Sequence, residues 1–267
     1  MPETSTEAPL ATETPTATPQ PEESSPSPAP TAAATAVASL PPRVGNPNAP
    51  KLALIIDDCG QWLPTERGFI ALPIPLTLSV LPHVHGSATI AQEAHDAGKG
   101  VMLHLPMETL SGMDPGPGKI TTEMTDAQIT AQVEDDLAQV PLATGVNNHE
   151  GSKASADSRV MNDVIDAIEK HGDLFFIDSR TNAASVAEQI ASANGVKTAA
   201  RDVFLDNEAN VAYSEGQLRE AAAIAKRTGS AIAIGHPKPT TLEAVQALIP
   251  EFQAEGIDFV LARQLTR

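Results

Sequence analysis

Two adjacent carboxylates, Asp57 and Asp58, are the residues of this sequence best suited to chemistry. They directly follow the apolar run 52–56, which is typical of a buried parallel strand. Two acids at the end of such a strand are costly unless a cation or hydrogen-bond donors meet them. One acid could therefore bind a metal ion while the other accepts a proton. The alternative is structural, with one acid capping a helix and the other solvated.

Polar side chains of the same kinds follow most of the other apolar runs. The ends of successive runs carry Asp57 and Asp58; His83; His104 with Glu108; Asn147, Asn148 and His149; Asp178 and Ser179; Asp206 and Asn207; and His236. In a parallel barrel the carboxyl ends of all strands open at one mouth, so these groups would converge. Some of them could only cap helices, but so many His and Asp residues at one mouth favour a functional site.

The chemistry that fits such a cluster is metal-assisted hydrolysis. Imidazole nitrogens and carboxylate oxygens are ligands of zinc-like cations, which in catalytic sites take three protein ligands and a water. The cation lowers the pKa of that water and polarises a carbonyl group. A second carboxylate can take the proton of the water, and a histidine can protonate the leaving group.

Strand-like runs and amphipathic helical patterns alternate along the chain and would position these residues. We expect strands over 52–57, 76–81, 101–105, 142–146, 174–177, 198–205, 231–234 and 257–261. Helices are expected after Ser87, at a capping box from Thr125 to Gln128, near Asp157 or Ser158, over 184–193, at a capping box from Ser214 to Gln217, and over 241–254. Residues 111–123 are rich in Gly and Pro and are expected to form a surface loop. Seven or eight strands in this rhythm predict an α/β fold with a parallel barrel.

Composition separates the first 48 residues from the rest. They are rich in Pro, Thr, Ser and Ala, lack aromatic residues, and are expected to form a disordered linker, with the folded domain over 49–267. The linker could be a spacer to a membrane anchor upstream of this chain, or simply a disordered tail. No apolar run is long enough to cross a membrane, and no signal peptide is visible.

Charge and cysteine content exclude several classes of function. The formal net charge is −17, and the linker, with five acids against Arg43, carries only −4 of it. An acidic domain without a basic stripe does not bind nucleic acid. The single cysteine, Cys59, excludes an intrachain disulfide framework and a cysteine-rich zinc site.

Seven short motifs together resemble a known family. They are IIDDCG, LPIPLTLSVLP, VMLHLPME, GVNNHEGS, FFIDS, VFLDN and AIGHP, and the match covers residues from about 51 to 265. This set is similar to the divergent polysaccharide deacetylase family (YibQ-like proteins) of the NodB-like carbohydrate esterase superfamily. The resemblance implies a distorted (β/α) barrel of about seven parallel strands. It also implies a metal-dependent hydrolase that deacetylates an N-acetylated envelope glycan, with a non-catalytic barrel that binds glycan or protein as the alternative.

The resemblance also implies roles for individual residues. Asp57 matches the general base, Asp58 a metal ligand and His236 the general acid. His104 matches the first histidine of the second motif, where Glu108 stands in place of the second histidine. The third ligand is therefore His149 or Glu108, of which we prefer His149.

Further residues are expected to contact the substrate. The resemblance also implies a cofactor, a partner and a cellular location. The expected substrate-binding residues are Glu108, Asn148, Ser152, Asp178 and Ser179. The expected cofactor is a divalent metal, with zinc preferred, and the expected partner is a glycan rather than nucleic acid. The expected location is the periplasm or cell envelope of a bacterium.

Overall fold

The computed structural model describes residues 48–267. The expected linker over residues 1–48 lies outside this range except for its last residue. Within residues 48–267, no helix combines the length and the apolar character that a membrane span requires.

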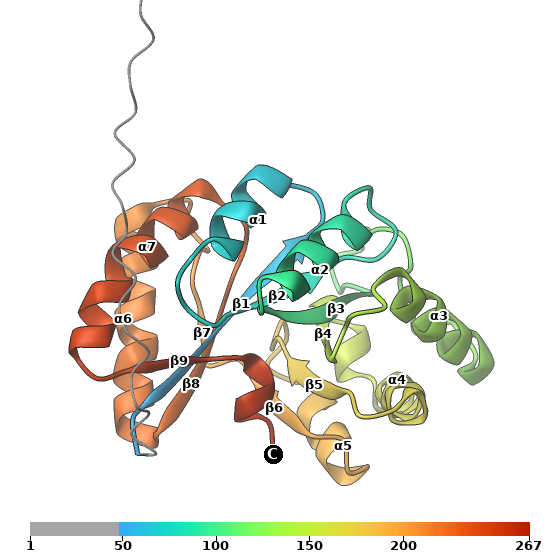
Figure 1. Cartoon of the computed structure of the whole chain (residues 1–267). Coiled ribbons are helices and arrows are strands. Elements are labelled where there is room, and N and C mark those ends of the chain that lie inside the picture. Colours follow the sequence, from blue (N-terminus) through green and yellow to red (C-terminus); the bar gives the residue numbers. More distant parts are fainter. Residues whose placement is uncertain (1–47) are drawn as a thin grey trace, which may run out of the picture. The chain divides into compact units, whose positions relative to one another are not determined.

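The described residues form one parallel sheet and its covering helices (Figure 1). The strands are β1 (Lys51–Cys59), β2 (Thr77–Val80), β3 (Gly100–Met107), β4 (Gly145–Glu150), β5 (Phe175–Asp178), β6 (Thr198–Ala200), β7 (Val203–Phe204), β8 (Ser230–Gly235) and β9 (Asp258–Val260). The helices are α1 (Leu63–Ile70), α2 (Ser87–Asp96), α3 (Asp126–Gln139), α4 (Ser158–His171), α5 (Ala187–Ala193), α6 (Val211–Thr228) and α7 (Pro239–Ala254). Two short 3₁₀ helices, η1 (Ala154–Ala156) and η2 (Ala262–Leu265), complete the set. The expected α/β fold with a parallel sheet is confirmed.

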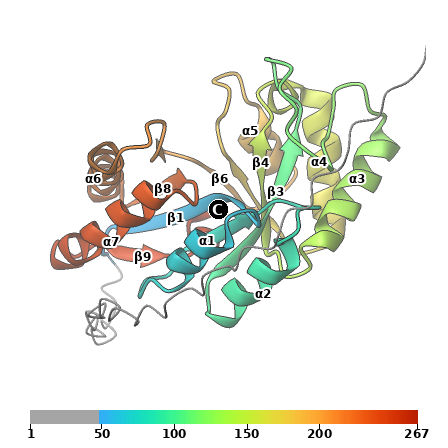
Figure 2. The same cartoon turned by 90° about the horizontal axis from the view of Figure 1, so that it is seen from above.

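The sheet curls into a barrel that stays open between two short strands. The strand order is β6-β5-β4-β3-β2-β1-β8-β7, with β9 also paired to β1. Figure 2 shows the curl, because β1, β8 and β9 run at a steep angle to β3 and β4. Arg201 lies in the chain between β6 and β7, and its Nε donates to the Ser179 carbonyl 2.7 Å away. The expected single strand over 198–205 is therefore wrong, since the chain leaves one edge at Ala200 and joins the other at Val203.

Alternation along each strand builds two apolar layers. Leu52, Leu54 and Ile56 of β1 pack with the helices in the larger cluster, whereas Ala53 and Ile55 face the barrel interior. The interior cluster comprises Ala53, Ile55, Met102, Phe175, Ile177, Ile232, Ile234, Val260 and Ala262. These side chains fill the barrel below the carboxyl ends of the strands, so the mouth rests on a packed floor.

Several expected boundaries differ from the structure. The strand expected over 142–146 instead runs from Gly145 to Glu150, so the Asn-Asn-His stretch lies within it. The capping box expected at Ser214 is wrong, because Asn210 caps α6 and the Ser214 side chain is buried inside the helix. The capping box from Thr125 to Gln128 and the start of α4 after Asp157 are confirmed. Helix α5 begins at Ala187, later than residue 184, because Asn182 and Ser185 form turns with hydrogen bonds of their own.

Candidate active site

Most of the polar groups at the barrel mouth continue the interior-facing rows of the apolar floor. Side chains two positions apart on a strand point to the same face. Each of four interior apolar residues is therefore followed, two positions later, by a polar residue at the mouth: Ile55 by Asp57, Met102 by His104, Ile177 by Ser179, and Ile234 by His236. Ser79 of β2 and Asn147 and His149 of β4 occupy the equivalent rows. The site therefore forms where the last interior-facing position of a strand, or the position just after it, holds a polar residue and not an apolar one.

Asp58 departs from this alternation and reaches the mouth by a backbone device. Alternation alone would turn its side chain away from that of Asp57. The pairing of β1 with β2 shifts register between Ile56 and Cys59, and Asp58 has φ 57°, in the left-handed region that Asp tolerates better than most residues. Both carboxylates consequently face the same space, while the thiol of Cys59 is buried and donates to the Ile56 carbonyl.

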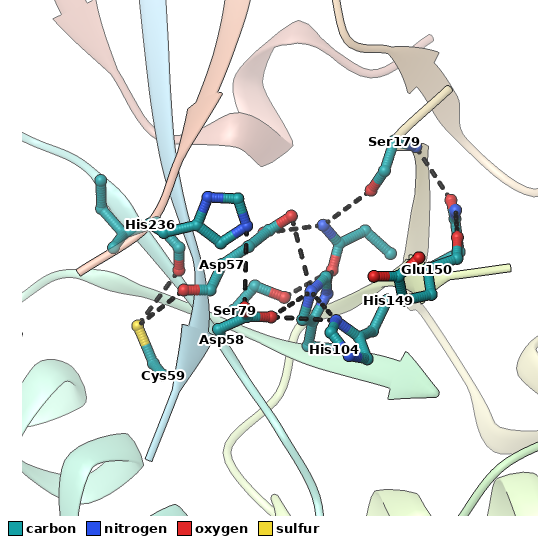
Figure 3. Close-up of polar contacts among 12 residues, drawn as sticks. Asp57, Asp58, Cys59, Ser79, His104, His149, Glu150, Ser179 and His236 are labelled. Atoms are coloured by element: carbon teal, nitrogen blue, oxygen red, sulfur yellow. Dashed lines mark hydrogen bonds and ion pairs between the residues drawn. The ribbon is translucent and has the colours of Figure 1, made fainter. Parts of the chain in front are cut away.

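Asp58, His104 and His149 come together at the mouth, as the sequence-based ligand choice requires (Figure 3). Asp58 Oδ1 lies 2.9 Å from His149 Nδ1 and 3.2 Å from His104 Nε2. The two ring nitrogens are 3.1 Å apart. Three donor atoms from β1, β3 and β4 thus form a nearly equilateral triangle.

This triangle fits a divalent cation by chemistry and by size. Asp58 Oδ1 is buried and accepts no hydrogen bond of regular geometry from any described residue. His104 Nδ1 lies 2.8 Å from Asn147 Oδ1, which can only accept, so in a neutral ring the lone pair of Nε2 points at the triangle. Lone pairs facing a carboxylate oxygen repel unless a cation or proton lies between them. Ligands at tetrahedral corners around zinc are about 3.3–3.5 Å apart, close to the observed distances.

Asn147 is the hub that orients the site, and all four of its side-chain hydrogen bonds are made. Its Oδ1 accepts from Ser79 Oγ and His104 Nδ1, and its Nδ2 donates to Asp57 Oδ1 at 2.9 Å and to Ser179 Oγ at 3.1 Å. The ionised carboxylate of Asp57 can only accept, so this bond fixes which end of the amide is nitrogen. Asn147 was noted as one of the polar residues at a strand end, but it was not among the expected site residues.

We expect Asn147→Ala to lower the free energy of unfolding by about 2–4 kcal/mol, because it strands the buried His104 Nδ1 and Asp57 Oδ1 without partners. Urea denaturation followed by circular dichroism measures the change. Ser79→Ala, which removes one outer contact of the hub, should cost only about 1 kcal/mol. Equal losses in the two variants would contradict the central place of Asn147.

The environments of the two acids push their pKa values in opposite directions. Burial raises the pKa of Asp57, although nearby His104 and His236 and the Asn147 amide act against it. Burial also acts to raise the pKa of Asp58, but the close contact and charge of His104 and His149 outweigh it, so the pKa falls well below its usual range. Two neighbouring acids separated in this way are suited to different tasks, Asp58 as a permanent anion and Asp57 as a proton acceptor.

His236 lies on the side of the acid pair opposite to His104 and His149 (Figure 3). Its Nε2 lies 3.7 Å from Asp58 Oδ2, and its Nδ1 lies 2.9 Å from Oδ1 of the fully buried Asp206. Asp206 Oδ2 accepts from the His236 backbone N–H and from Thr241 Oγ1, both at 2.8 Å. Burial lowers the pKa of His236, but Asp206 and the two site acids outweigh it and raise the pKa above its usual value. A histidine held in this way can carry a proton.

Glu108, the alternative third ligand, is engaged by other groups. Its Oε2 accepts from both the backbone N–H and the hydroxyl of Thr122 at 2.7 Å, and its Oε1 pairs with Lys153 at 2.7 Å. Burial acts to raise its pKa, but Lys153 and Thr122 outweigh this and lower the pKa to about 2. The carboxylate therefore ties the loop after β3 to the loop after β4.

The other expected substrate-binding residues fall into two groups. Ser179 lies at the mouth, where Asn147 donates to its hydroxyl. Asp178, one residue earlier, lies in the row of Phe176 that faces the helices, and it accepts from Ser185 Oγ and the Arg180 backbone. Asn148 Oδ1 accepts from the Ser179 backbone, and Ser152 Oγ accepts from the Leu110 backbone. These bonds brace the loops of the mouth, so a direct substrate contact stays a prediction.

His83, which follows β2, belongs to a separate cluster. Its Nε2 lies 2.9 Å from Asp136 Oδ1 and 3.3 Å from Asp135 Oδ2, both on α3. Asp136 is buried, and mainly for that reason its pKa is raised to about 7. His83 therefore pairs with helix α3 and not with the acid pair, although it too follows a strand end.

Two curated proteins are similar to this chain in sequence. An uncharacterized protein of Haemophilus influenzae is 38% identical over 198 residues, which cover 74% of this chain and 70% of that protein. The uncharacterized protein YibQ of Escherichia coli is 37% identical over 201 residues, which cover 75% of this chain and 63% of YibQ.

Solved structures share the fold. The uncharacterized protein ATU2773 of Agrobacterium tumefaciens matches with a TM-score of 0.77 and 24% identity, over 81% of this chain and 89% of that one. A CE4 family pseudoenzyme from Bacillus anthracis matches with a TM-score of 0.52 and 14% identity, over 83% and 66%. A T48 deacetylase with substrate matches with a TM-score of 0.52 and 17% identity, over 81% and 90%. The expected distorted parallel barrel is confirmed, since these structures share it.

The sequence model of one family covers nearly all of the described residues. It is the model described as divergent polysaccharide deacetylase, and it matches residues 54–266. The family resemblance inferred from the seven motifs is thus confirmed, and the chain belongs to the divergent polysaccharide deacetylase family.

Proposed function

We propose that the protein is a metal-dependent hydrolase that removes acetyl groups from an N-acetylated glycan of the bacterial cell envelope. The observation that carries the proposal is the triangle of Asp58 Oδ1, His104 Nε2 and His149 Nδ1 beside the buried Asp57. A triangle of one carboxylate and two imidazoles suits zinc, which we favour as the metal.

The residues around the triangle fit the tasks of amide hydrolysis. Asp58, His104 and His149 would hold the cation, which when bound would polarise the acetamide carbonyl and lower the pKa of a water. Asp57 Oδ2 lies 3.6 Å from His104 Nε2, and this carboxylate would take the proton of the attacking water. His236, on the other side, would give a proton to the departing amine of the sugar.

Acetate release with controlled metal content tests this proposal. Protein stripped with a chelator should release no acetate from chitin oligomers or peptidoglycan fragments, and one equivalent of zinc should restore release. Protein that carries stoichiometric metal and releases no acetate from either substrate would contradict it.

The pKa shifts predict a bell-shaped pH profile with a movable alkaline limb. Asp57 must be ionised and its pKa is raised, so activity should fall as pH drops through a value above 3.8. His236 must be protonated and its pKa is raised above 6.5, so activity should fall as pH rises through that higher value. Asp206→Asn removes the charge that holds the proton, so the alkaline limb should move to lower pH and kcat at pH 8 should fall about tenfold.

Thr241→Ala is the matched control for this profile. It removes the hydroxyl that donates to Asp206 Oδ2 and leaves the carboxylate charge, so the alkaline limb should stay in place. An alkaline limb that stays in place in Asp206→Asn would argue against His236 as the acid.

The second candidate is a non-catalytic barrel that binds glycan or a protein partner. Two observations favour it: Glu108 stands where the second histidine of the wider superfamily is expected, and one structural neighbour is named a pseudoenzyme. An inactive protein whose Asp57→Ala variant still binds glycan unchanged would support this candidate.

The setting of the activity is also part of the proposal. We infer a glycan as the partner and the periplasm or cell envelope as the location. Family membership supports the glycan, and the acidic charge argues against nucleic acid, which repels an acidic domain.

A further inference from the structure

Trp62 is an exposed indole at the edge of the site. It is the only tryptophan of the chain, and half of its surface is accessible to solvent. Large apolar side chains are otherwise exposed in the described residues only at Leu110 and Met113. An exposed tryptophan beside polar machinery is typical of a binding surface, because its flat apolar face gains by covering a ligand.

A cavity joins this indole to the reacting groups. Its volume is about 490 Å³, within the usual range for small-molecule sites, and its walls are mostly apolar. The lining residues are Asp58, Trp62, Thr65, His236, Pro237, Lys238 and Pro239. The ammonium group of Lys238 donates to the Asp206 carbonyl 2.9 Å away. The same cavity is therefore lined by the Asp58 carboxylate and by His236, the proposed acid, and also by the apolar surfaces of Trp62 and two prolines.

The backbone that carries Trp62 is held rigidly although its side chain is exposed. Glu66 is fully buried, and its Oε1 accepts from the backbone N–H groups of Gly60, Gln61 and Trp62 at 2.9, 3.1 and 2.8 Å. The Trp62 carbonyl in turn accepts from the N–H groups of Thr65 and Glu66. A surface whose backbone is fixed before binding loses little entropy when a ligand arrives.

We propose that Trp62 is a stacking platform for a pyranose ring of the glycan, one unit away from the sugar whose acetamide reacts. This inference rests on the proposed function. A pyranose ring presents a face of C–H groups that packs on an aromatic face, and the indole offers no charge that would select an anion instead. The cavity that Trp62 lines reaches Asp58 but neither His104 nor His149, so a ring packed on the indole would be a neighbouring unit of the chain. The protein should therefore prefer oligomers to single sugars, with Glu66 acting as a positioning residue for the platform.

The single tryptophan makes the test direct. Intrinsic fluorescence of the zinc-loaded Asp57→Asn variant, which leaves the sugar intact, is titrated with N-acetylglucosamine and with its β-1,4-linked tetramer. The tetramer should give a saturable change in tryptophan emission at concentrations where the single sugar gives little. Calorimetry in the same Asp57→Asn background measures the affinity for the tetramer. Trp62→Ala should weaken this affinity about tenfold, and the affinity of Trp62→Phe should lie between those of the alanine variant and the protein with Trp62.

Kinetics and a matched control complete the test. In otherwise unaltered enzyme, Trp62→Ala should lower the ratio of kcat/KM for the tetramer to that for the single sugar about tenfold. Leu110→Ala removes another exposed apolar side chain that does not line this cavity, and it should leave that ratio unchanged.

The outcomes separate the platform from the hydrolase. Tetramer binding that shifts the emission and weakens in Trp62→Ala supports the platform even if no acetate is released, which would overturn the hydrolase alone. Acetate release with unchanged emission and equal tetramer affinity in Trp62→Ala overturns the platform alone. No binding of the tetramer and no acetate release overturn both.

Discussion

Replacing Asp57 with asparagine is expected to lower kcat for acetate release by about 10²- to 10⁴-fold, while the protein keeps its fold and its metal affinity. Asparagine has the same shape and can still accept the hydrogen bond from Asn147 Nδ2, but it cannot take a proton. Burial already holds the pKa of Asp57 above its ordinary value, as a general base requires. The measurement is kcat on a chitin oligomer at saturating zinc, together with a thermal melt of both proteins.

Asp96→Asn is the control for this substitution. It makes the same chemical change at an exposed carboxylate on α2 and should leave kcat unchanged. Full activity in Asp57→Asn would remove Asp57 from the chemistry, and a loss of metal from that variant would make it a ligand instead.

Replacing His104 with alanine is expected to weaken zinc binding more than 100-fold, because it deletes one of the three proposed ligands, whose ring is held by Asn147. Zinc at a hundredfold excess over its Kd should stabilise the unaltered protein by about 2.7 kcal/mol, and the same zinc concentration should hardly stabilise the variant. Calorimetric titration and thermal melts with and without zinc measure both effects.

His95→Ala is the matched control, since this histidine is exposed on α2 and pairs only with its neighbour Asp96 among the described residues. Zinc affinity should be unchanged in that variant. Metal that stays bound at one equivalent in both His104→Ala and Asp58→Ala would show that the cation is held elsewhere, with the His83 cluster as the next place to look.

The fold was largely predictable because its signal is local. The apolar run before Asp57 and the helical patterns between strands follow from side-chain periodicity, which the sequence displays directly. The break between β6 and β7 was not predictable, because it depends on the distance across the open edge of the barrel and not on the residues from Thr198 to Leu205. The late end of β4 was missed because Asn and His are weak strand formers, and here they are held in place by pairing with β3.

The residue types of the site were predictable, but their side-chain directions and hydrogen bonds were less so. Strand ends pointed to a larger set of His and Asp residues, and the family resemblance selected Asp58, His104 and His149 among them. The structure brings these three together. Ser79 was missed, although its hydroxyl lies in the interior row near the end of the apolar strand β2. The direction of Asp58 could not be predicted, because it depends on a positive φ angle within a register shift. Alternation along β5 would have separated Ser179 from Asp178 had it been applied there.

The proposed function depends on one cation shared by three strands, and anomalous diffraction from crystals grown with zinc tests it most directly. We expect a single strong peak at the zinc absorption edge, bounded by Asp58 Oδ1, His104 Nε2 and His149 Nδ1. Protein loaded with zinc whose only peaks lie away from these three atoms would contradict the metal-dependent hydrolase and leave the barrel without its proposed chemistry.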